Sequence, residues 1–110
     1  MSVLVIDIGS SSVRALLCDE QARPIPDAIA QRKHQFTTQP HGAAFADPDH
    51  LRSLTEACID DVLSHKAAAD IRVVGMATFA GNLLGVDADN QPLTPLYTYA
   101  DTRSTPYAAD

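Results

Sequence analysis

The first part of the chain alternates short apolar runs with polar turns. Residues 3–8 form a β-branched run that ends at Gly9, and residues 13–18 form a second apolar run. Because only a short Gly/Ser stretch separates the two runs, they predict a hairpin of antiparallel strands. Residues 27–37 alternate less cleanly, which predicts a third strand or an edge strand.

A helical period follows. Asp47 can cap a helix N-terminus, and Pro48 suits the first helical position. The apolar residues after it share one helix face: Leu51, Leu54, Cys58, Ile59, Val62 and Leu63. We therefore expect an amphipathic helix over residues 47–68, packed on one face of the sheet.

The remaining residues return to extended patterns. Residues 71–79 and 83–86 are apolar runs that predict two more strands, with a polar turn between the second run and Pro92. Residues 92–99 are extended and interrupted by proline, and residues 101–110 resemble the start of a helix.

This order of elements predicts an α/β fold with a mixed sheet of about five strands. A single helix cannot cover both faces of such a sheet. One face is then left apolar and exposed, so we expect further chain or a partner to cover it.

Composition removes several classes of function. The chain has 110 residues, with 14 acidic and 8 basic side chains and a net charge of −6. Without a basic cluster, nucleic acids and anionic membranes are poor partners. No apolar run approaches the roughly 20 residues of a membrane span, and the N-terminus lacks the basic segment of a signal peptide. We expect a cytoplasmic protein.

Cysteine and histidine suggest no metal or redox chemistry. Two cysteines, Cys18 and Cys58, set no disulfide framework, and we expect them to be small buried hydrophobic side chains. The four histidines lack metal-ligand spacing and are expected at the surface: His34, His41, His50 and His65.

The strongest chemical signal is the turn after the first run. Asp7 ends an apolar strand, and Gly9-Ser10-Ser11 follow. Successive N–H groups and hydroxyls in such a turn can cradle a phosphate, and an adjacent carboxylate can hold Mg²⁺. An ordinary hairpin with a solvated acid is the alternative. The pattern is neither a Walker-type loop nor a dinucleotide fingerprint, because no Gly-Lys-Ser/Thr follows and the turn leads to a strand.

Residues 7–15, with Arg14 among them, resemble the first phosphate motif of the actin/hexokinase/Hsp70 ATPase superfamily. Further segments resemble the FGGY carbohydrate kinases, and the likeness runs from residue 3 to 104. Three segments carry the FGGY resemblance. The first contains Gly42 and Asp47-Pro48, the second joins residues 74–77 to residues 83–87, and the third is residues 92–104.

The resemblance implies a ribonuclease-H-like (actin-like ATPase) half-domain, with residues 1–110 as the N-terminal part of the first domain of a longer sugar kinase. Such enzymes use ATP and Mg²⁺ to phosphorylate a hydroxyl of a sugar or polyol. By the same resemblance, the catalytic base and the adenosine site lie beyond Asp110. The 110-residue chain is therefore expected to be inactive alone.

The resemblance also implies roles for single residues. Asp7 matches the Mg²⁺ and phosphate acid, and Gly9, Ser10 and Ser11 would approach the β- and γ-phosphates. The candidate sugar-binding residues are Thr78, Asn82, Tyr99, Asp101 and Arg103. For Thr78 and Asn82 the alternative is turn capping, and for Tyr99 it is an ordinary half-buried strand tyrosine. For Asp101 and Arg103 the alternative is an ion pair with each other. Arg14 is either a functional basic residue or a solvated strand charge.

This sequence departs from xylulose- and gluconate-type members between Thr78 and Asn82. Phe79-Ala80-Gly81 replace their Gln-Met-His-like side chains, so the sequence does not name the sugar. Tyr99 stands where the family usually has tryptophan.

Two other classes remain to be weighed. A free-standing half-domain would bind a partner through its exposed sheet face, and we expect the isolated chain to self-associate by the same face. A different superfamily member, acetate-kinase-like or chaperone-like, is disfavoured by the segment from Tyr99 to Arg103. Whether the reading frame continues past Asp110 separates the kinase from the free-standing module.

Overall fold

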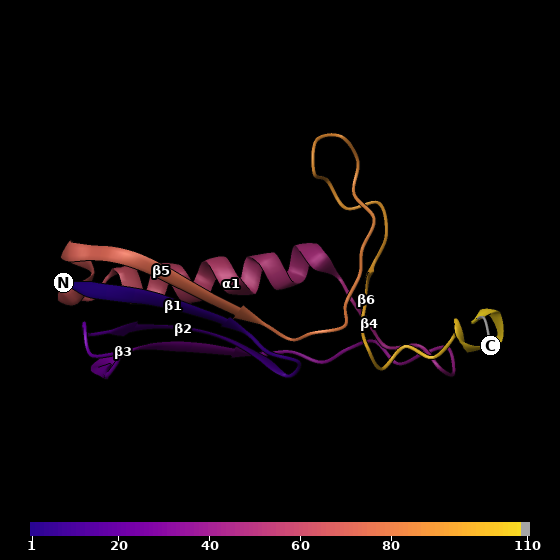
Figure 1. Ribbon diagram of the computed structural model, residues 1–110, viewed down its shortest axis with the longest axis horizontal. Helices are drawn as coiled ribbons and strands as arrows, with labels where there is room; N and C mark the ends of the chain where they lie inside the picture. Colours follow the sequence, from indigo (N-terminus) through magenta and orange to yellow (C-terminus); the bar gives the residue numbers. More distant parts are fainter. Residues whose placement is uncertain (109–110) are drawn as a thin grey trace.

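Three consecutive strands form an antiparallel meander in the computed structural model, which describes residues 1–108 (Figure 1). They are β1 (Ser2–Ile8), β2 (Ser12–Cys18) and β3 (Pro24–Lys33). Strand β5 (Ile71–Thr78) pairs with β1 in parallel, which gives the order β3-β2-β1-β5. The predicted hairpin and mixed sheet are confirmed, although the main sheet has four strands and β3 begins and ends earlier than expected.

One long helix covers part of this sheet. Helix α1 spans Pro48–Leu63, and the Asp47 carboxylate caps it by accepting the Asp49 N–H at 3.0 Å. The helix was expected to reach residue 68, which is wrong. The imidazole Nδ1 of His65 accepts the Ala67 N–H at 3.0 Å and starts a separate 3₁₀ helix, η1 (Lys66–Asp70). Within residues 1–108, no helix is long and apolar enough to cross a membrane.

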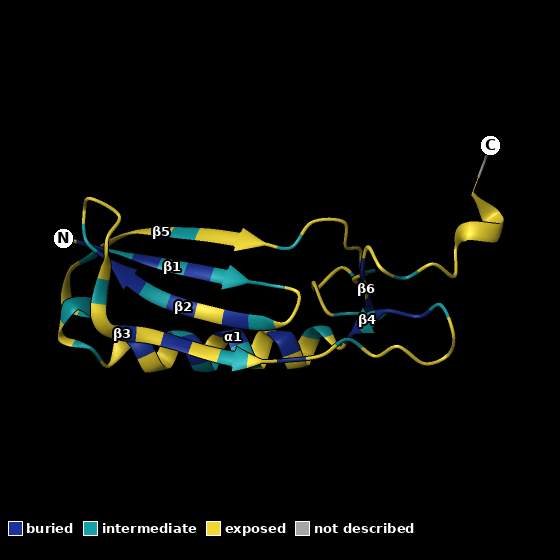
Figure 2. Ribbon diagram, turned by 90° about the horizontal axis from the view of Figure 1, so that it is seen from below, coloured by how far each residue is buried: buried dark blue, intermediate teal, exposed yellow. Residues whose placement is uncertain are grey.

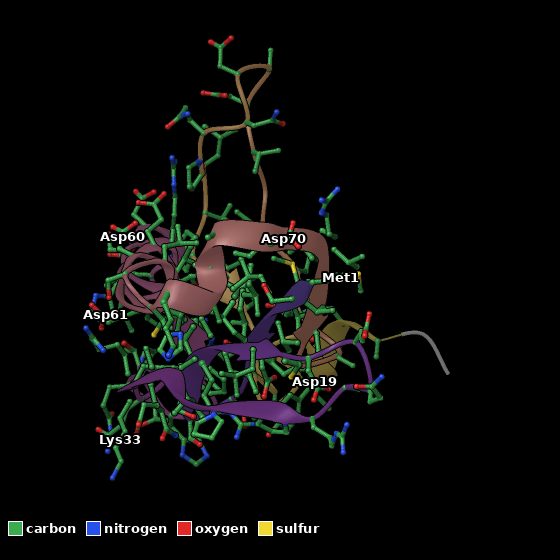
Figure 3. All side chains as sticks on the ribbon, turned by 90° about the vertical axis from the view of Figure 1, so that its left-hand side faces the viewer. Met1, Asp19, Lys33, Asp60, Asp61 and Asp70 are labelled. Carbon is green, nitrogen blue, oxygen red and sulfur yellow. The ribbon has the colours of Figure 1, made fainter. Side chains whose placement is uncertain are left out.

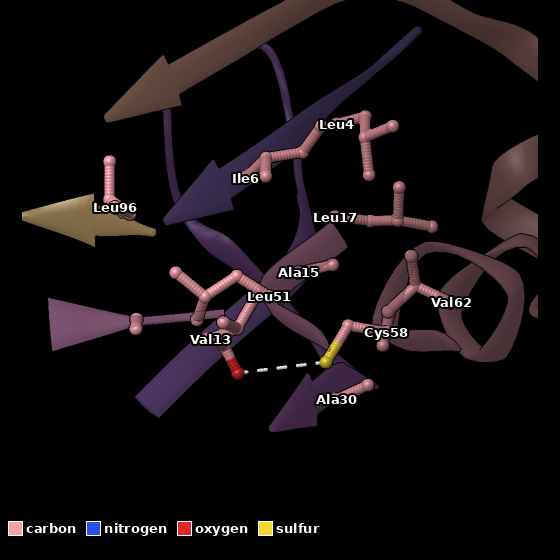
Figure 4. Close-up of a cluster of buried hydrophobic side chains, with 12 residues drawn as sticks. Leu4, Ile6, Val13, Ala15, Leu17, Ala30, Leu51, Cys58, Val62 and Leu96 are labelled. Carbon is pink, nitrogen blue, oxygen red and sulfur yellow. Dashed lines mark hydrogen bonds between the residues drawn. The ribbon is translucent and has the colours of Figure 1, made fainter. Parts of the chain in front are cut away.

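The core lies between α1 and the meander (Figure 4). Leu17, Val13 and Cys58 are its largest fully buried side chains. The Cys58 thiol donates to the Val13 carbonyl, with Sγ and O 3.6 Å apart, and burial raises the pKa of that thiol. Cys18 is buried too, so both cysteines behave as predicted. At the edge of this layer, Arg32 of β3 donates to Asp61 of α1 at 2.6 Å. Figure 3 labels Asp61 on the helix and Lys33 at the end of β3.

The sheet face away from α1 is open. Ile29 is 57% exposed and Val73 50%, both on that face. Because α1 packs on β2 and β3, strand β5 is also open on the helix side, where Val74 and Met76 are exposed (Figure 2). The expected uncovered apolar face is therefore present, and it continues around the β5 edge.

The chain after β5 leaves the main sheet. Strands β4 (Phe45–Ala46) and β6 (Leu96–Tyr97) pair antiparallel beside its end, and the molecule extends over 51 × 28 × 24 Å (Figure 1). The segment between β5 and β6 projects as a loop.

Two expectations for this region were wrong. Residues 83–86 form no regular strand; Leu83 and Val86 make single bridges to Tyr97 and Pro92. The partner segment contains Pro92 and Pro95, which have no N–H to extend a ladder. The helix expected over 101–110 is only a short 3₁₀ turn, η2 (Thr105–Tyr107), and residues 109–110 lie outside the described part.

Candidate functional site

The turn between β1 and β2 leaves two adjacent backbone amides without a partner in the described part of the protein. The Gly9 N–H donates to the Ser12 carbonyl at 2.8 Å. A Cβ on residue 9 would lie 3.0 Å from that carbonyl oxygen, which is a tight contact, so the close turn favours glycine here. Ser10 and Ser11 are exposed, and within residues 1–108 their N–H groups make no hydrogen bond to the protein. Two adjacent free amides and two hydroxyls thus face solvent, as phosphate binding requires.

Asp7 lies beside this turn, on the face of the sheet away from α1. It stands directly opposite Arg14 on β2, whose guanidinium donates to the carboxylate at 2.6 Å. The Asp7 side chain is 33% exposed and that of Arg14 46% exposed. An exposed pair of this kind contributes only about 0–1 kcal/mol, so the carboxylate can exchange this partner for a cation at small cost.

Strand β5 brings Thr78 to the same sheet edge. Because β5 is parallel to β1, their carboxyl ends meet, with Thr78 beside Ile8 and the Phe79 N–H donating to the Ile8 carbonyl at 2.9 Å. Thr78 follows Ala77, the partner of Asp7, and therefore points to the opposite face. There it lines an apolar hollow with Leu51 and other residues of the start of α1.

The loop after β5 packs against Tyr99. Gly81 has φ +74°, and a Cβ there would come within 2.9 Å of the Tyr99 Cβ. The tyrosine is 64% exposed, not the half-buried strand residue that was the alternative. The Asn82 side-chain amide donates to the Phe79 carbonyl, so Asn82 does cap its own turn.

Asp101 and Arg103 form a bidentate ion pair. The Arg103 Nε and Nη2 donate to the two Asp101 carboxylate oxygens at 3.1 and 2.7 Å, and the Ala44 N–H donates to the same carboxylate at 3.1 Å. The Asp101 side chain is only 9% exposed. The Arg103 hydrogen bond, and then the Ala44 N–H, hold the pKa of Asp101 well below its usual range. The guanidinium also stacks near the rings of Phe45 and Tyr97, 5.4 and 5.8 Å from their centroids.

The predicted residues thus fall into two groups. Asp7, Gly9, Ser10 and Ser11 lie together at the β1–β2 turn, with Thr78 at the adjacent strand end. The second group surrounds the loop after β5, where a hollow is lined by Asn82, Asp101 and Arg103 but not by Tyr99. In the described residues, no cluster of three histidine, cysteine or acidic side chains could hold a metal alone, so a cation at Asp7 would need phosphate or water as further ligands.

Two residues near these groups were missed. His34 was expected at the surface, but it is buried, with 9% of the residue exposed. Its imidazole forms a hydrogen bond with the Gly9 carbonyl. Tyr97 lines the hollow at Asp101. The two-residue spacing of Tyr97 and Tyr99 would suggest one shared face, but only Tyr97 lines this hollow. Nothing in the sequence placed His34 behind the turn.

The family model for the N-terminal domain of the FGGY family of carbohydrate kinases matches residues 2–110. The chain belongs to this family. The sequence resemblance is thereby confirmed, including its fold: a mixed α/β half-domain of the actin-like ATPase type. A search of curated proteins found no match.

Solved structures of FGGY kinases share this fold. A xylulose kinase from Brucella ovis is 25% identical with a TM-score of 0.87, and the match covers 94% of this chain and 22% of that one. A gluconate kinase from Lactobacillus acidophilus (18%, TM-score 0.82) and the Plasmodium falciparum glycerol kinase with ADP (16%, TM-score 0.87) each match 96% of this chain. They are matched over 21% and 22% of their own length, so this chain spans about a fifth of these kinases.

Proposed function

We propose that this chain is the N-terminal portion, within the first domain, of a kinase that transfers the γ-phosphoryl group of ATP to a hydroxyl of a sugar or polyol. Family membership supports phosphoryl transfer to a carbohydrate. The named relatives act on gluconate, xylulose and glycerol, which supports the breadth of the acceptor class. The acidic chain and its lack of a basic cluster make nucleic acids and membranes poor partners, and we propose a cytoplasmic location.

One observation carries the ATP part of the proposal. The free N–H groups of Ser10 and Ser11 lie next to the Asp7 carboxylate at the open end of β1. Glycine at position 9 allows a phosphate to approach this backbone closely. This donor set fits a phosphate with its bound cation: amides for the phosphate oxygens and a carboxylate for Mg²⁺.

The protein's own groups then act by positioning and by charge. Bound Mg²⁺·ATP supplies the phosphoryl group and neutralises part of its developing charge. Asp7 would hold the cation, and the amides and hydroxyls of Ser10 and Ser11 would orient the β- and γ-phosphates. Arg14, once released from Asp7, would supply a positive charge on the same face of the sheet. No residue of this chain is proposed as the catalytic base.

For the acceptor, we propose Tyr99 as an exposed platform on which an apolar sugar face stacks. Thr78 and the free face of Asn82 supply hydrogen bonds. Asp101 and Arg103 act by holding the loop at Ala44, because the carboxylate oxygens of Asp101 are already occupied. Of the five candidate acceptor residues, these two are thus assigned a positioning role.

The uncovered apolar face favours a second candidate function. Ile29 and Val73 would allow a free-standing half-domain to bind a partner without catalysis. The two functions differ in one observation: a kinase requires the reading frame to continue past Asp110 into a further domain with its own acidic base and adenosine site.

The test is an assay of the complete protein and of residues 1–110 side by side. We expect the complete protein to consume ATP in the presence of Mg²⁺ and a panel of sugars and polyols, with one acceptor preferred. We expect the 110-residue chain to show no turnover, because the base and adenosine site are missing. Turnover by the short chain, or a complete protein that neither binds ATP nor phosphorylates any acceptor, would refute the proposal.

A further inference from the structure

His34 lies directly behind the phosphate turn. It follows the end of β3 and is 9% exposed. Its imidazole Nε2 lies 2.8 Å from the Gly9 carbonyl oxygen, and its backbone N–H donates to the Ser11 carbonyl at 3.0 Å. The residue that directly follows β3 therefore contacts the turn at two carbonyls, on either side of Ser10.

The acceptor in this contact shows that one particular ring nitrogen carries a proton. A carbonyl oxygen only accepts, so Nε2 carries the proton and donates. The other nitrogen, Nδ1, is buried without a hydrogen-bond partner among residues 1–108. A leucine or phenylalanine would fill this space without burying an unpaired polar atom. What the imidazole adds over an apolar side chain is the hydrogen bond to Gly9.

We propose that His34 is a positioning residue for the phosphate turn. By holding the Gly9 carbonyl toward the protein, the imidazole keeps the N–H of Ser10 directed to solvent, since the carbonyl of Gly9 and the N–H of Ser10 belong to one peptide and point in opposite directions. It acts on phosphate through this backbone without touching it. This inference rests on the proposed ATP-binding function of the turn.

The ring also joins the two parts of the candidate site. The His34 and Phe36 rings have centroids 5.7 Å apart, and those of Phe36 and Phe79 are 5.5 Å apart. Phe79 begins the loop that carries Asn82. The orientation of the turn and the position of this loop therefore share one packed aromatic chain.

Three substitutions in the complete protein separate the hydrogen bond from packing. His34→Leu removes the donor, His34→Gln keeps an N–H near the position of Nε2, and His50→Leu is the control on the exposed surface of α1. We expect His34→Leu to raise KM for MgATP about tenfold and to leave the acceptor KM within about twofold. Its melting temperature should stay near that of the wild type, because removal of the unpaired Nδ1 offsets the hydrogen bond lost at the Gly9 carbonyl. His34→Gln and the control should stay near wild type.

A readout without ATP separates failure of this inference from failure of the proposed function. Hydrogen exchange followed by mass spectrometry should show faster exchange over residues 9–13 in His34→Leu, but not in His34→Gln or His50→Leu. Unchanged exchange at the turn in His34→Leu, or equal defects in the leucine and glutamine variants, would overturn the positioning role. If exchange is faster in His34→Leu but the wild type binds no ATP, His34 still positions the turn. That result would overturn both the role of His34 in phosphate binding and the proposed function.

Discussion

At the scale of single residues, burial and hydrogen bonding distinguish Asp7 from Asp101, the two acids among the candidate site residues. Asp7 is 33% exposed and shares a single exposed partner, whereas Asp101 is 9% exposed and its two oxygens accept from Arg103 and Ala44. A carboxylate with one weak partner can bind a cation. One whose oxygens are occupied within the protein serves the fold. The motifs named both acids as candidate site residues, and the difference in their partners is the reason why we propose different tasks for them.

The charge of Asp7 is expected to matter for turnover more than for acceptor binding. In the complete protein, Asp7→Asn keeps the shape and removes the charge. We expect kcat to fall about 10²–10³-fold, as for loss of one electrostatic group in a transition state. Acceptor affinity, measured by calorimetry, should change by less than about twofold. Asp60→Asn on the exposed face of α1 is the control. A normal kcat with lost acceptor binding would contradict the assignment.

The Asp101–Arg103 pair predicts a specific pH dependence. The pKa of Asp101 is held below its unfolded value of about 3.9. A group with a lowered folded pKa stabilises the protein above the unfolded pKa and loses this contribution as pH falls through the folded value. Asp101→Asn should therefore melt at a lower temperature than wild type by a constant margin between about pH 5 and 8.

That margin should shrink below about pH 4, where the Asp101 carboxylate begins to bind a proton in the unfolded chain while it stays ionised in the folded protein. Thermal unfolding of both proteins followed by circular dichroism measures it, and Asp89→Asn in the exposed loop serves as the control. A margin that changes between pH 6 and 8, where Asp101 stays ionised, would mean that another group controls the difference.

At the scale of elements, prediction succeeded where local pattern and tertiary contact agree. The meander and the helix start were predictable because their apolar periods and the Asp47 cap act locally. The strand over 83–86 failed because its partner segment contains prolines, so an apolar run did not become a ladder. The burial of His34 also escaped prediction, because it depends on a contact with Gly9, twenty-five positions earlier in the chain.

Two glycines in neighbouring elements make a matched test of loop packing. Gly81 has a positive φ, and a Cβ there would lie 2.9 Å from the Tyr99 Cβ, whereas a Cβ at Gly75 on β5 meets nothing within 4 Å. Gly81→Ala should destabilise the protein by about 1–2 kcal/mol and displace Tyr99. Gly75→Ala should be neutral or slightly stabilising, because alanine restricts the unfolded chain.

Chemical denaturation measures both stabilities, and the intrinsic tyrosine fluorescence of the two variants reports on the region of Tyr99. Equal stabilities would show that the loop after β5 adjusts freely, and Tyr99 would then lose its fixed position as a proposed sugar platform.

At the scale of the whole molecule, the chain is more extended than a compact domain. The radius of gyration is 16.6 Å, compared with about 13 Å for a compact domain of this length. Residues after β5 extend away from the sheet, and β5 is exposed on both faces (Figures 1 and 2). The expectation of an uncovered face could be made from sequence, because one helix cannot cover two faces. The sequence could not predict that the uncovered face continues around the β5 edge, because that depends on where α1 packs.

This uncovered face predicts that residues 1–110 alone self-associate. Apolar patches beyond a few hundred Å² are rare on soluble monomers, and their burial is worth about 25 cal/mol per Å². The net charge of −6 opposes association only weakly, because the Debye length is about 8 Å at physiological salt.

Light scattering should give a mass that rises with concentration. Ile29→Lys with Val73→Lys places charge on the face and should lower that mass, since both side chains are already half exposed. Leu83→Lys with Leu93→Lys makes the same change on the projecting loop and should leave it unchanged. A wild type that stays monomeric at every concentration, or association abolished only by the loop pair, would show that the sheet face does not drive it.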